Sequence, residues 1–161
     1  MRASAVTPSA STTDLLDRLQ YQVALSARRA EQTRLGGVGK AGNAMDRGAY
    51  LLLHRLDSDG PMGVTALAEA MGIDPSTVTR QVTPLVDSGL VKRTSDPEDR
   101  RAVVLDLSPR GRSRLEEIRT SRQQLMAIAT EGWTPEERET FADLLSRLHR
   151  TLIERARSGA L

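Results

Sequence analysis

The segment 64–107 constrains the fold most, because two short helical patterns are followed there by an alternating pattern typical of strands. The first helical pattern is "VTALAEAM" (64–71), and "GID" follows it as a tight turn. Asp74 and Pro75 then favour a helix start, since aspartate accepts bonds from free amides and proline fits the first helical position. The sequence therefore predicts two helices joined by a glycine-containing turn.

The second of these helices separates an apolar side from a small polar side. Its apolar positions are Val78, Val82, Leu85 and Val86, and Gly89 follows as a left-handed cap. Its polar positions are Ser76, Thr77, Thr79, Arg80, Gln81 and Thr83. Short hydroxyl side chains allow a helix to lie deep in a major groove, where Arg80 can bind guanine and Gln81 can bind adenine. A polar helix face is common, so this pattern alone does not establish DNA binding.

The alternating segments "LVKRTS" (90–95) and "AVVLDL" (102–107) predict a β-hairpin with Val103, Leu105 and Leu107 facing inward. The hairpin tip reads "DPEDRR". One interpretation of this tip is a solvated, charged turn. The other is a wing, a hairpin whose tip arginine enters a DNA minor groove. A helix-turn-helix directly precedes the hairpin, and this order favours the wing.

Longer helical patterns precede this region. Residues 1–12 are small and polar, which is typical of a disordered tail, and Leu15, Leu19 and Val23 then recur at helical spacing. A glycine-rich connector follows, whose "GVGK" lacks the earlier glycine and the Ser/Thr of a phosphate-binding loop. Asp46 can cap a further helix through "RGAYLLLHRL", which the turn "DSDGPMG" is expected to end.

Two more helices are predicted after the hairpin. Ser108 and Thr134 are each followed by proline and mark helix starts, and Glu137 completes a capping box. The first of these helices has an apolar stripe of Leu115, Ile118, Leu125 and Ala129, and the second has an apolar seam of Phe141, Leu144, Leu145, Leu148 and Leu152. Over 110–122, five arginines stand against two glutamates. This excess can contact a phosphate backbone, or it can belong to a solvated helix start.

The composition argues against several classes of function. Aromatic residues make up 2% of the 161 residues, too few for a platform that stacks single-stranded bases. There is no cysteine, which excludes disulfides and thiol-based switches, and with two histidines we expect neither a metal site nor a cofactor. No nucleophile–base pair can be assembled, so we do not expect an enzyme. Without a signal-peptide core or a run of ~18 apolar residues, we expect a cytoplasmic protein that does not enter a membrane.

The run "LAEAMGIDPSTVTRQVTPLVDSGLVKRTSDPEDRRAVVLDLSPRG" resembles the winged helix-turn-helix of the MarR-type transcriptional regulators. The resemblance extends to "DRGAYLLLHRL" and to the end helices, roughly residues 14–155. It implies a mainly α (α+β) fold, a winged helix-turn-helix with a small β-hairpin between N- and C-terminal dimerisation helices. Its most specific element is the Asp-x-Arg of the hairpin tip. By resemblance, Arg101 enters the minor groove, Asp99 orients its guanidinium and Arg100 contacts a phosphate.

The resemblance also implies an obligate homodimer built from the end helices. We expect the interface to use Leu15, Leu19, Val23, Phe141, Leu145, Leu148 and Leu152. Many members of the family are released from DNA by small, often aromatic, molecules that bind between the dimerisation helices and the winged domain. For such a ligand the candidates are Tyr21, Tyr50 and His54, although ordinary packing is the alternative interpretation of each.

We therefore expect a sequence-specific regulator of transcription, most often a repressor, that binds pseudo-palindromic sites in double-stranded DNA as a homodimer. The candidate DNA-binding residues are Thr65, Ser76, Thr77, Thr79, Arg80, Gln81, Thr83, Asp99, Arg100 and Arg101. The alternative is a helical protein-interaction module that does not bind DNA. The expected organisation is a tail over 1–12, a dimerisation helix and connector over 13–45, the DNA-binding domain over 46–108, and dimerisation helices over 109–157.

Pro84 departs from the helical pattern inside the expected recognition helix. It removes the backbone bond to the carbonyl of Arg80, so we expect a kink or early unwinding before Gly89.

Overall fold

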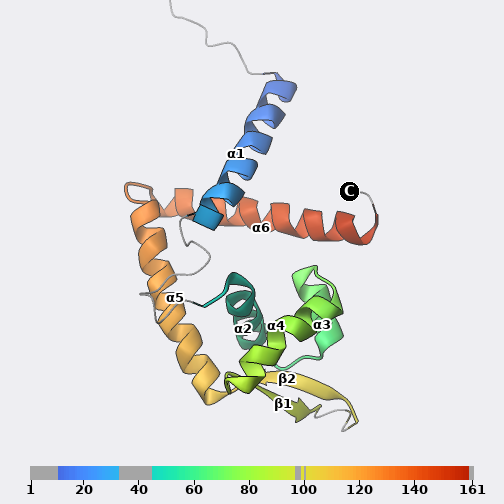
Figure 1. Ribbon diagram of the computed structural model, residues 1–161. Helices are drawn as coiled ribbons and strands as arrows, with labels where there is room; N and C mark the ends of the chain where they lie inside the picture. The colour runs from blue at the N-terminus through green and yellow to red at the C-terminus, as the bar shows by residue number, and fades with distance from the viewer. Residues whose placement is uncertain (1–10, 33–44, 97–98, 100, 160–161) are drawn as a thin grey trace, which may run out of the picture. The chain divides into compact units, whose positions relative to one another are not determined.

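The computed structural model describes residues 11–32, 45–96, 99 and 101–159. The chain divides into two compact units, Met1–Gly36 and Gly37–Leu161. The described elements are, in chain order, α1 (Thr12–Gln32), α2 (Arg47–Asp59), α3 (Val64–Met71), α4 (Pro75–Asp87), β1 (Val91–Ser95), β2 (Val103–Leu107), α5 (Pro109–Ala129) and α6 (Pro135–Arg157). The fold is thus mainly helical with one β-hairpin, as the sequence predicts (Figure 1).

The described part of the first unit is the single helix α1. Its first turn is capped reciprocally, because the Ser11 amide donates to Asp14 and the Asp14 amide donates to the Ser11 hydroxyl, both at 3.2 Å. The apolar residues Leu15, Leu19 and Val23 are all exposed within the unit. Since one amphipathic helix cannot bury its own apolar face, α1 needs a second surface to pack against.

The second unit has one hydrophobic core, which the helix-turn-helix and the hairpin share. Helix α2 crosses its centre with Leu52, Leu53 and Leu56 fully buried. Around α2 are packed the buried residues Leu67 and Ala68 of α3, Val78, Val82 and Leu85 of α4, Val91, Leu105 and Leu107 of the hairpin, and Leu115 and Ile118 of α5. The core is therefore aliphatic, as the low aromatic content requires.

The hairpin is antiparallel, with a register that runs from Val91 opposite Leu107 to Ser95 opposite Val103. An additional bridge joins Met62 and Leu105, whose amides and carbonyls exchange hydrogen bonds of 3.1 and 2.9 Å. The prediction that Val103 faces inward is wrong, since 61% of this residue is exposed. Val103 lies at the distal end of the ladder, whereas the next residue, Val104, is buried together with Leu105, so the burial of β2 does not follow strict alternation there.

The hairpin is joined closely to the start of α5. The Ser108 amide donates to the Leu90 carbonyl at 3.0 Å, and the Ser108 hydroxyl donates to the Gly89 carbonyl at 2.6 Å. The same hydroxyl accepts from the Gly111 amide at 2.9 Å, which caps α5 as predicted. A Cβ atom at Gly111 would lie 2.0 Å from the Leu90 carbonyl oxygen, so only glycine allows this approach.

Helix α4 runs through Pro84 to Asp87, so the predicted early unwinding is wrong. Pro84 still lacks the amide bond, but its own carbonyl accepts from the Ser88 amide at 3.0 Å. Val82 and Leu85, which precede and follow Pro84 in the sequence, are buried and hold the helix against the core. Likewise α2 continues into the predicted turn as far as Asp59, and Gly60 ends it.

Helices α5 and α6 leave much of their apolar surface uncovered within the second unit. Along α5, Leu115 and Ile118 are buried, but Leu125 is only half-buried and Ala129 is exposed. Helix α6 starts at the predicted capping box of Thr134 and Glu137 and has no buried residue. It leads from the end of α5 back toward α3 (Figure 1), where Arg157 donates to a backbone carbonyl of that helix. Among the described residues, no helix has the length and apolar content to cross a membrane.

Candidate nucleic-acid interface

The N-terminus of α4 is organised by the carboxylate of Asp74. This carboxylate accepts from the Ser76 hydroxyl, from the Thr77 amide at 2.9 Å and from the Thr77 hydroxyl at 2.6 Å. These bonds hold the pKa of Asp74 well below its usual value, and the bond from Ser76 has the largest effect. The residue is therefore ionised at neutral pH. The cap prediction is confirmed, and the hydroxyl protons of both predicted DNA-binding residues are already engaged by Asp74.

The exposed face of α4 contains Thr79, Arg80 and Thr83. The Thr79 hydroxyl donates to the Pro75 carbonyl at 3.0 Å, and the Thr83 hydroxyl donates to the Thr79 carbonyl at 2.9 Å. The two threonine hydroxyls donate to carbonyls of their own helix. Arg80 has the long side chain on this face, and its guanidinium can extend away from the helix. A guanidinium can donate two parallel bonds to the major-groove edge of guanine.

Gln81 lies on a different side of α4 from the one predicted. Its side chain packs over Gly48 at the start of α2, where an added Cβ atom would lie 2.8 Å from the Gln81 amide nitrogen. The residue is half-buried and lines a cavity of about 370 Å³ that Met45 and Leu85 also line. Gln81 therefore serves the packing of α4 on α2, and we exclude it from the residues proposed to contact DNA.

The hairpin tip is closed by three short-range bonds. The Asp96 amide donates to the Ala102 carbonyl, the Ala102 amide to the Asp99 carbonyl, and the Arg101 amide to the Asp99 carboxylate, each at 2.9 Å. Arg101 is exposed. The resemblance implied that Asp99 orients the guanidinium of Arg101, but here its carboxylate binds the backbone instead. Asp99 thus fixes the turn from which Arg101 projects, whereas Arg100 lies outside the described residues.

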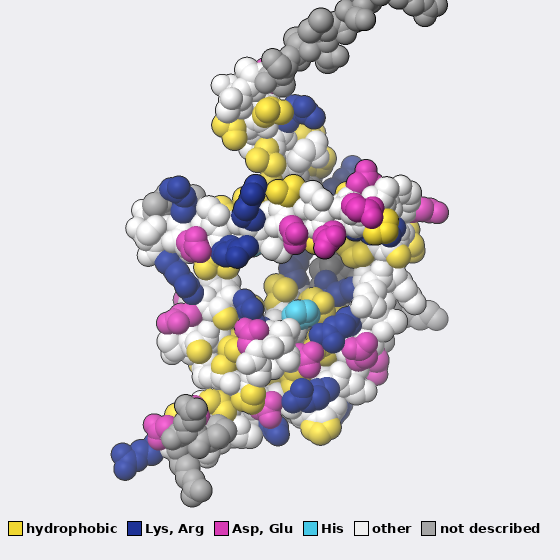
Figure 2. Space-filling model, turned by 180° about the vertical axis from the view of Figure 1, so that it is seen from behind, with side chains coloured by type: hydrophobic (Ala, Val, Ile, Leu, Met, Phe, Trp, Pro, Cys, Tyr) yellow, Lys and Arg dark blue, Asp and Glu magenta, His cyan; other side chains and the backbone are white. Residues whose placement is uncertain are grey.

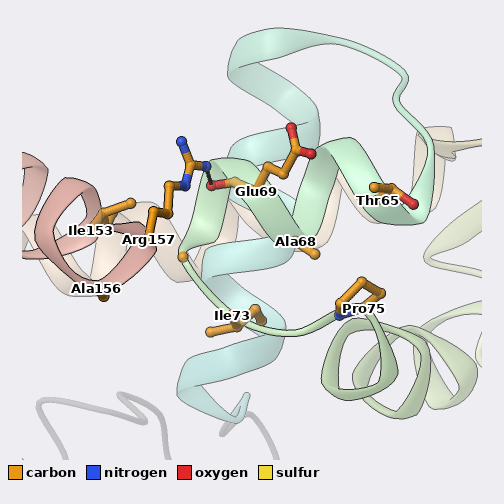
Figure 3. Close-up of a pocket in the computed structure, with 9 residues that line it drawn as sticks. Thr65, Ala68, Glu69, Ile73, Pro75, Ile153, Ala156 and Arg157 are labelled. Carbon is orange, nitrogen blue, oxygen red and sulfur yellow. Dashed lines mark hydrogen bonds between the residues drawn. The ribbon is translucent and has the colours of Figure 1, made fainter. Parts of the chain in front are cut away.

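Thr65 is exposed at the start of α3 and lies beside Pro75 at the start of α4 (Figure 3). Both residues line a cavity of about 340 Å³, whose other wall is formed by Ile153 and Arg157 of α6. Ile153 packs on the turn between α3 and α4, since an added Cβ atom at Gly72 would lie 2.9 Å from its Cγ1. The C-terminal end of α6 therefore contacts the helix-turn-helix directly.

The candidate ligand residues on α2 lie together, and they are joined by an arginine that the sequence places only in the basic excess over 110–122. The rings of Tyr50 and His54 are 5.9 Å apart, and the Arg122 guanidinium carbon of α5 lies 3.9 Å above the centre of the Tyr50 ring. Burial lowers the pKa of Arg122 from its usual value. The cluster combines a cation with aromatic rings. Tyr21, the third candidate, belongs to the first unit and is exposed there.

The predicted dimer residues are mostly uncovered in their own units. Phe141, Leu145 and Leu152 of α6 are exposed, and Leu148 is half-buried. The remaining predicted positions are Leu15, Leu19 and Val23 of α1, exposed as described above. On the face shown in Figure 2, basic and acidic side chains are mixed rather than separated into one basic surface. Along α5, the arginines Arg112, Arg114 and Arg119 each pair with an acidic residue.

Helices α2, α3 and α4 are followed by a two-stranded hairpin, and all of them pack on one core while the polar face of α4 stays exposed. This arrangement defines a winged helix-turn-helix protein. Comparison with known proteins agrees with this class. The profile described as "MarR family" matches residues 46–103. An uncharacterised HTH-type transcriptional regulator of Bacillus subtilis, YxaD, is 31% identical over 139 residues, which are 86% of this chain and 96% of that protein. The chain belongs to the MarR family of transcriptional regulators.

Two further relatives are informative. The transcriptional repressor MdtR of Bacillus subtilis is 27% identical over 138 residues, covering 86% of this chain and 88% of that protein. A structure of Bordetella bronchiseptica BpsR, described as regulated in its DNA binding by 6-hydroxynicotinic acid, matches 79% of this chain and 98% of its own with 27% identity and a TM-score of 0.61.

Proposed function

We propose that this regulator binds double-stranded DNA as a homodimer, with α4 in the major groove and the hairpin tip in the adjacent minor groove. The observation that carries this proposal is the exposure of two arginines at two separate points. Arg80 projects from the polar face of α4, and Arg101 projects from a turn that Asp99 fixes. Base contacts from α4 supply sequence discrimination, and the tip adds attraction to narrow, A·T-rich grooves.

Thr65, Ser76 and Thr77 are proposed to contact phosphates rather than bases. The hydroxyls of Ser76 and Thr77 donate to Asp74 in the free protein, so they must exchange this partner to donate to DNA. Thr79 and Thr83 limit the height of the helix surface and allow close approach. Arg100 is proposed to contact a phosphate next to the minor groove.

Dimerisation is proposed to use the apolar faces of α1 and α6. Each helix, taken within its own unit, exposes large apolar side chains: Leu15 and Leu19 on α1, and Phe141, Leu145 and Leu152 on α6. Exposed apolar faces of this kind mark surfaces that pack against a partner. A two-fold dimer presents two α4 helices to DNA and therefore requires a site with two-fold symmetry.

The sign of regulation is proposed to be negative, as the name of the repressor MdtR indicates for one relative. A small aromatic acid is the ligand class that we propose for the cluster of Tyr50, His54 and Arg122, because a guanidinium beside aromatic rings suits a planar anion. BpsR provides a precedent for a ligand of this class.

Selection of bound sequences from a random DNA pool tests the proposed function. We expect a pseudo-palindrome whose half-sites are about one helical turn, or ~10 bp, apart. Recovery of sequences without two-fold symmetry, or no enrichment at low salt, would contradict the proposal. Adding aromatic acids to the same binding reaction tests release, which we expect to depend on Arg122.

A further inference from the structure

The base of the hairpin is surrounded by a connected group of ion pairs that the proposed DNA contacts do not use. Asp57 near the end of α2 and Asp106 near the end of β2 are its two acidic members. Lys92 of β1 pairs with Asp106 at 3.0 Å, directly across the hairpin, and Arg119 of α5 pairs with Asp57 at 3.0 Å. These two pairs alone would remain separate.

Arg112 in the first turn of α5 joins the two pairs. Its Nη1 lies 3.5 Å from Oδ1 of Asp57, and its Nη2 lies 3.5 Å from Oδ1 of Asp106. One guanidinium therefore bridges α2 and β2, and a planar fork is suited to this because it presents donors in two directions. Through Arg112 the hairpin is connected electrostatically to the helix at the centre of the core.

The burial of the two carboxylates makes this bridge more than a surface ion pair. The side chain of Asp106 is 15% exposed and that of Asp57 is 27% exposed, so water screens both only in part. Oδ1 of Asp106 is buried and accepts no hydrogen bond from the described residues, and Arg112 is the cation on its side of the carboxylate, while Lys92 pairs with Oδ2. Loss of Arg112 would leave Asp106 paired only across the hairpin, and the link from β2 to Asp57 of α2 would be lost, which frees the base of the hairpin to shift.

A small rotation at the base of the hairpin becomes a large displacement at its tip. Arg101 lies five positions before Asp106, a distance of at most about 16 Å for extended chain. A rotation of about 10° at Asp106 would therefore move the tip by about 3 Å, half the roughly 6 Å width of a B-DNA minor groove. The bonds within the tip, including that of Asp99, would not correct such a rotation because they move with the hairpin.

We infer that Arg112 is a positioning residue, which holds the hairpin in the orientation that allows Arg101 to enter the minor groove. The inference rests on the proposed DNA binding. It assigns to Arg112 no contact with DNA, although 53% of its side chain is exposed. A direct phosphate contact by Arg112 is the competing explanation for any loss of binding, so the experiment must separate the two.

The test is a double-mutant cycle of Arg112→Ala and Arg101→Ala, with affinity for an A·T-rich duplex measured at several salt concentrations. A residue that acts only through the tip has no effect once the tip arginine is removed. We therefore expect Arg112→Ala to weaken binding by about fivefold or more in the wild-type background and by less than about twofold in the Arg101→Ala background. The salt slope of the double variant should equal that of Arg101→Ala alone.

Arg110→Ala is the matched control, because it removes the same charge from the same turn of α5 and Arg110 is exposed. Its effect should be equal in both backgrounds. Thermal unfolding must show that Arg112→Ala remains folded, and if it does not, Asp106→Asn replaces it in the cycle, since this variant breaks the bridge at the hairpin. Arg112→Lys should recover only part of the lost affinity, because one ammonium group cannot bridge both carboxylates at these distances.

Equal effects of Arg112→Ala in the two backgrounds, or a further fall in the salt slope of the double variant, would overturn the inference in favour of a direct phosphate contact. Unchanged affinity in the wild-type background would also overturn it. Neither result affects the proposed function, which would fail only if the wild-type protein itself does not bind DNA in the same titration.

Discussion

Gly111→Ala is predicted to destabilise the protein strongly at the junction between the hairpin and α5. The new Cβ atom would lie 2.0 Å from the Leu90 carbonyl oxygen and 2.8 Å from a methyl carbon of Leu107. The carbonyl would have to move by about 1 Å to reach even 3.0 Å, and this carbonyl also accepts from the Ser108 amide at 3.0 Å. The substitution therefore forces a backbone shift and breaks the bond that closes the hairpin.

The expected loss follows from these two effects. Overpacking against backbone costs about 3 kcal/mol, the upper part of its usual range, and the lost hydrogen bond costs about 1 kcal/mol. Alanine is favoured over glycine inside a helix by about 1 kcal/mol. The net effect is a fall of about 3 kcal/mol in the free energy of unfolding.

Urea unfolding at one fixed protein concentration measures this loss, since the stability of the proposed dimer would depend on concentration. Ser113→Ala, at an exposed position of the same helix, is the control and should remain within about 0.5 kcal/mol of the wild type. A loss below about 1 kcal/mol for Gly111→Ala would refute the close approach on which the reasoning depends.

Three other predictions concern the dimer, the cap of α4 and the hairpin tip. Leu148→Asp and Leu152→Asp each place a charge in the apolar face of α6 and should give monomers or insoluble protein. If sedimentation shows that both variants still form dimers like those of the wild type, this interface is excluded. The bonded carboxylate of Asp74 has a lowered pKa, so its contribution to stability is present above the unfolded pKa of about 4 and falls as the pH decreases below that value. The difference in unfolding free energy between wild type and Asp74→Asn should therefore shrink between pH 6 and about pH 2, and a constant difference would argue against the cap. Asp99→Ala should weaken binding less than Arg101→Ala, because it frees the turn but keeps the guanidinium; an equal or larger loss would show a further role for Asp99.

Those parts of the fold that depend on local sequence could be predicted. Helix starts at Asp74, Ser108 and Thr134 follow from a side chain that bonds amides two or three residues ahead, so spacing alone identifies them. The hairpin follows from its alternation. In contrast, alternation predicts that Val103 faces inward, but the structure exposes Val103 and buries its neighbour Val104, so strict alternation fails at the distal end of β2.

The rest depends on contacts between residues far apart in sequence. Gln81 belongs to the polar set by periodicity, yet Gly48 on another helix leaves space that its side chain fills. The cation of Arg122 is placed over Tyr50 by the packing of α5 on α2, which no spacing reveals. In the sequence Arg112 belongs to a basic excess over 110–122, but in the structure it pairs with two acidic residues from α2 and β2.

The most direct test of the proposed DNA binding compares Arg80→Ala and Arg101→Ala on a selected site and on a random duplex, across a series of salt concentrations. Arg80→Ala should cost about 1–3 kcal/mol on the selected site and little on random DNA, since a base contact specifies sequence. Arg101→Ala should weaken binding to the selected site and to A·T-rich DNA alike, and reduce the salt slope by about one unit. If both variants bind both duplexes as the wild type does, neither α4 nor the hairpin tip contacts DNA, and the proposed mode of recognition is wrong.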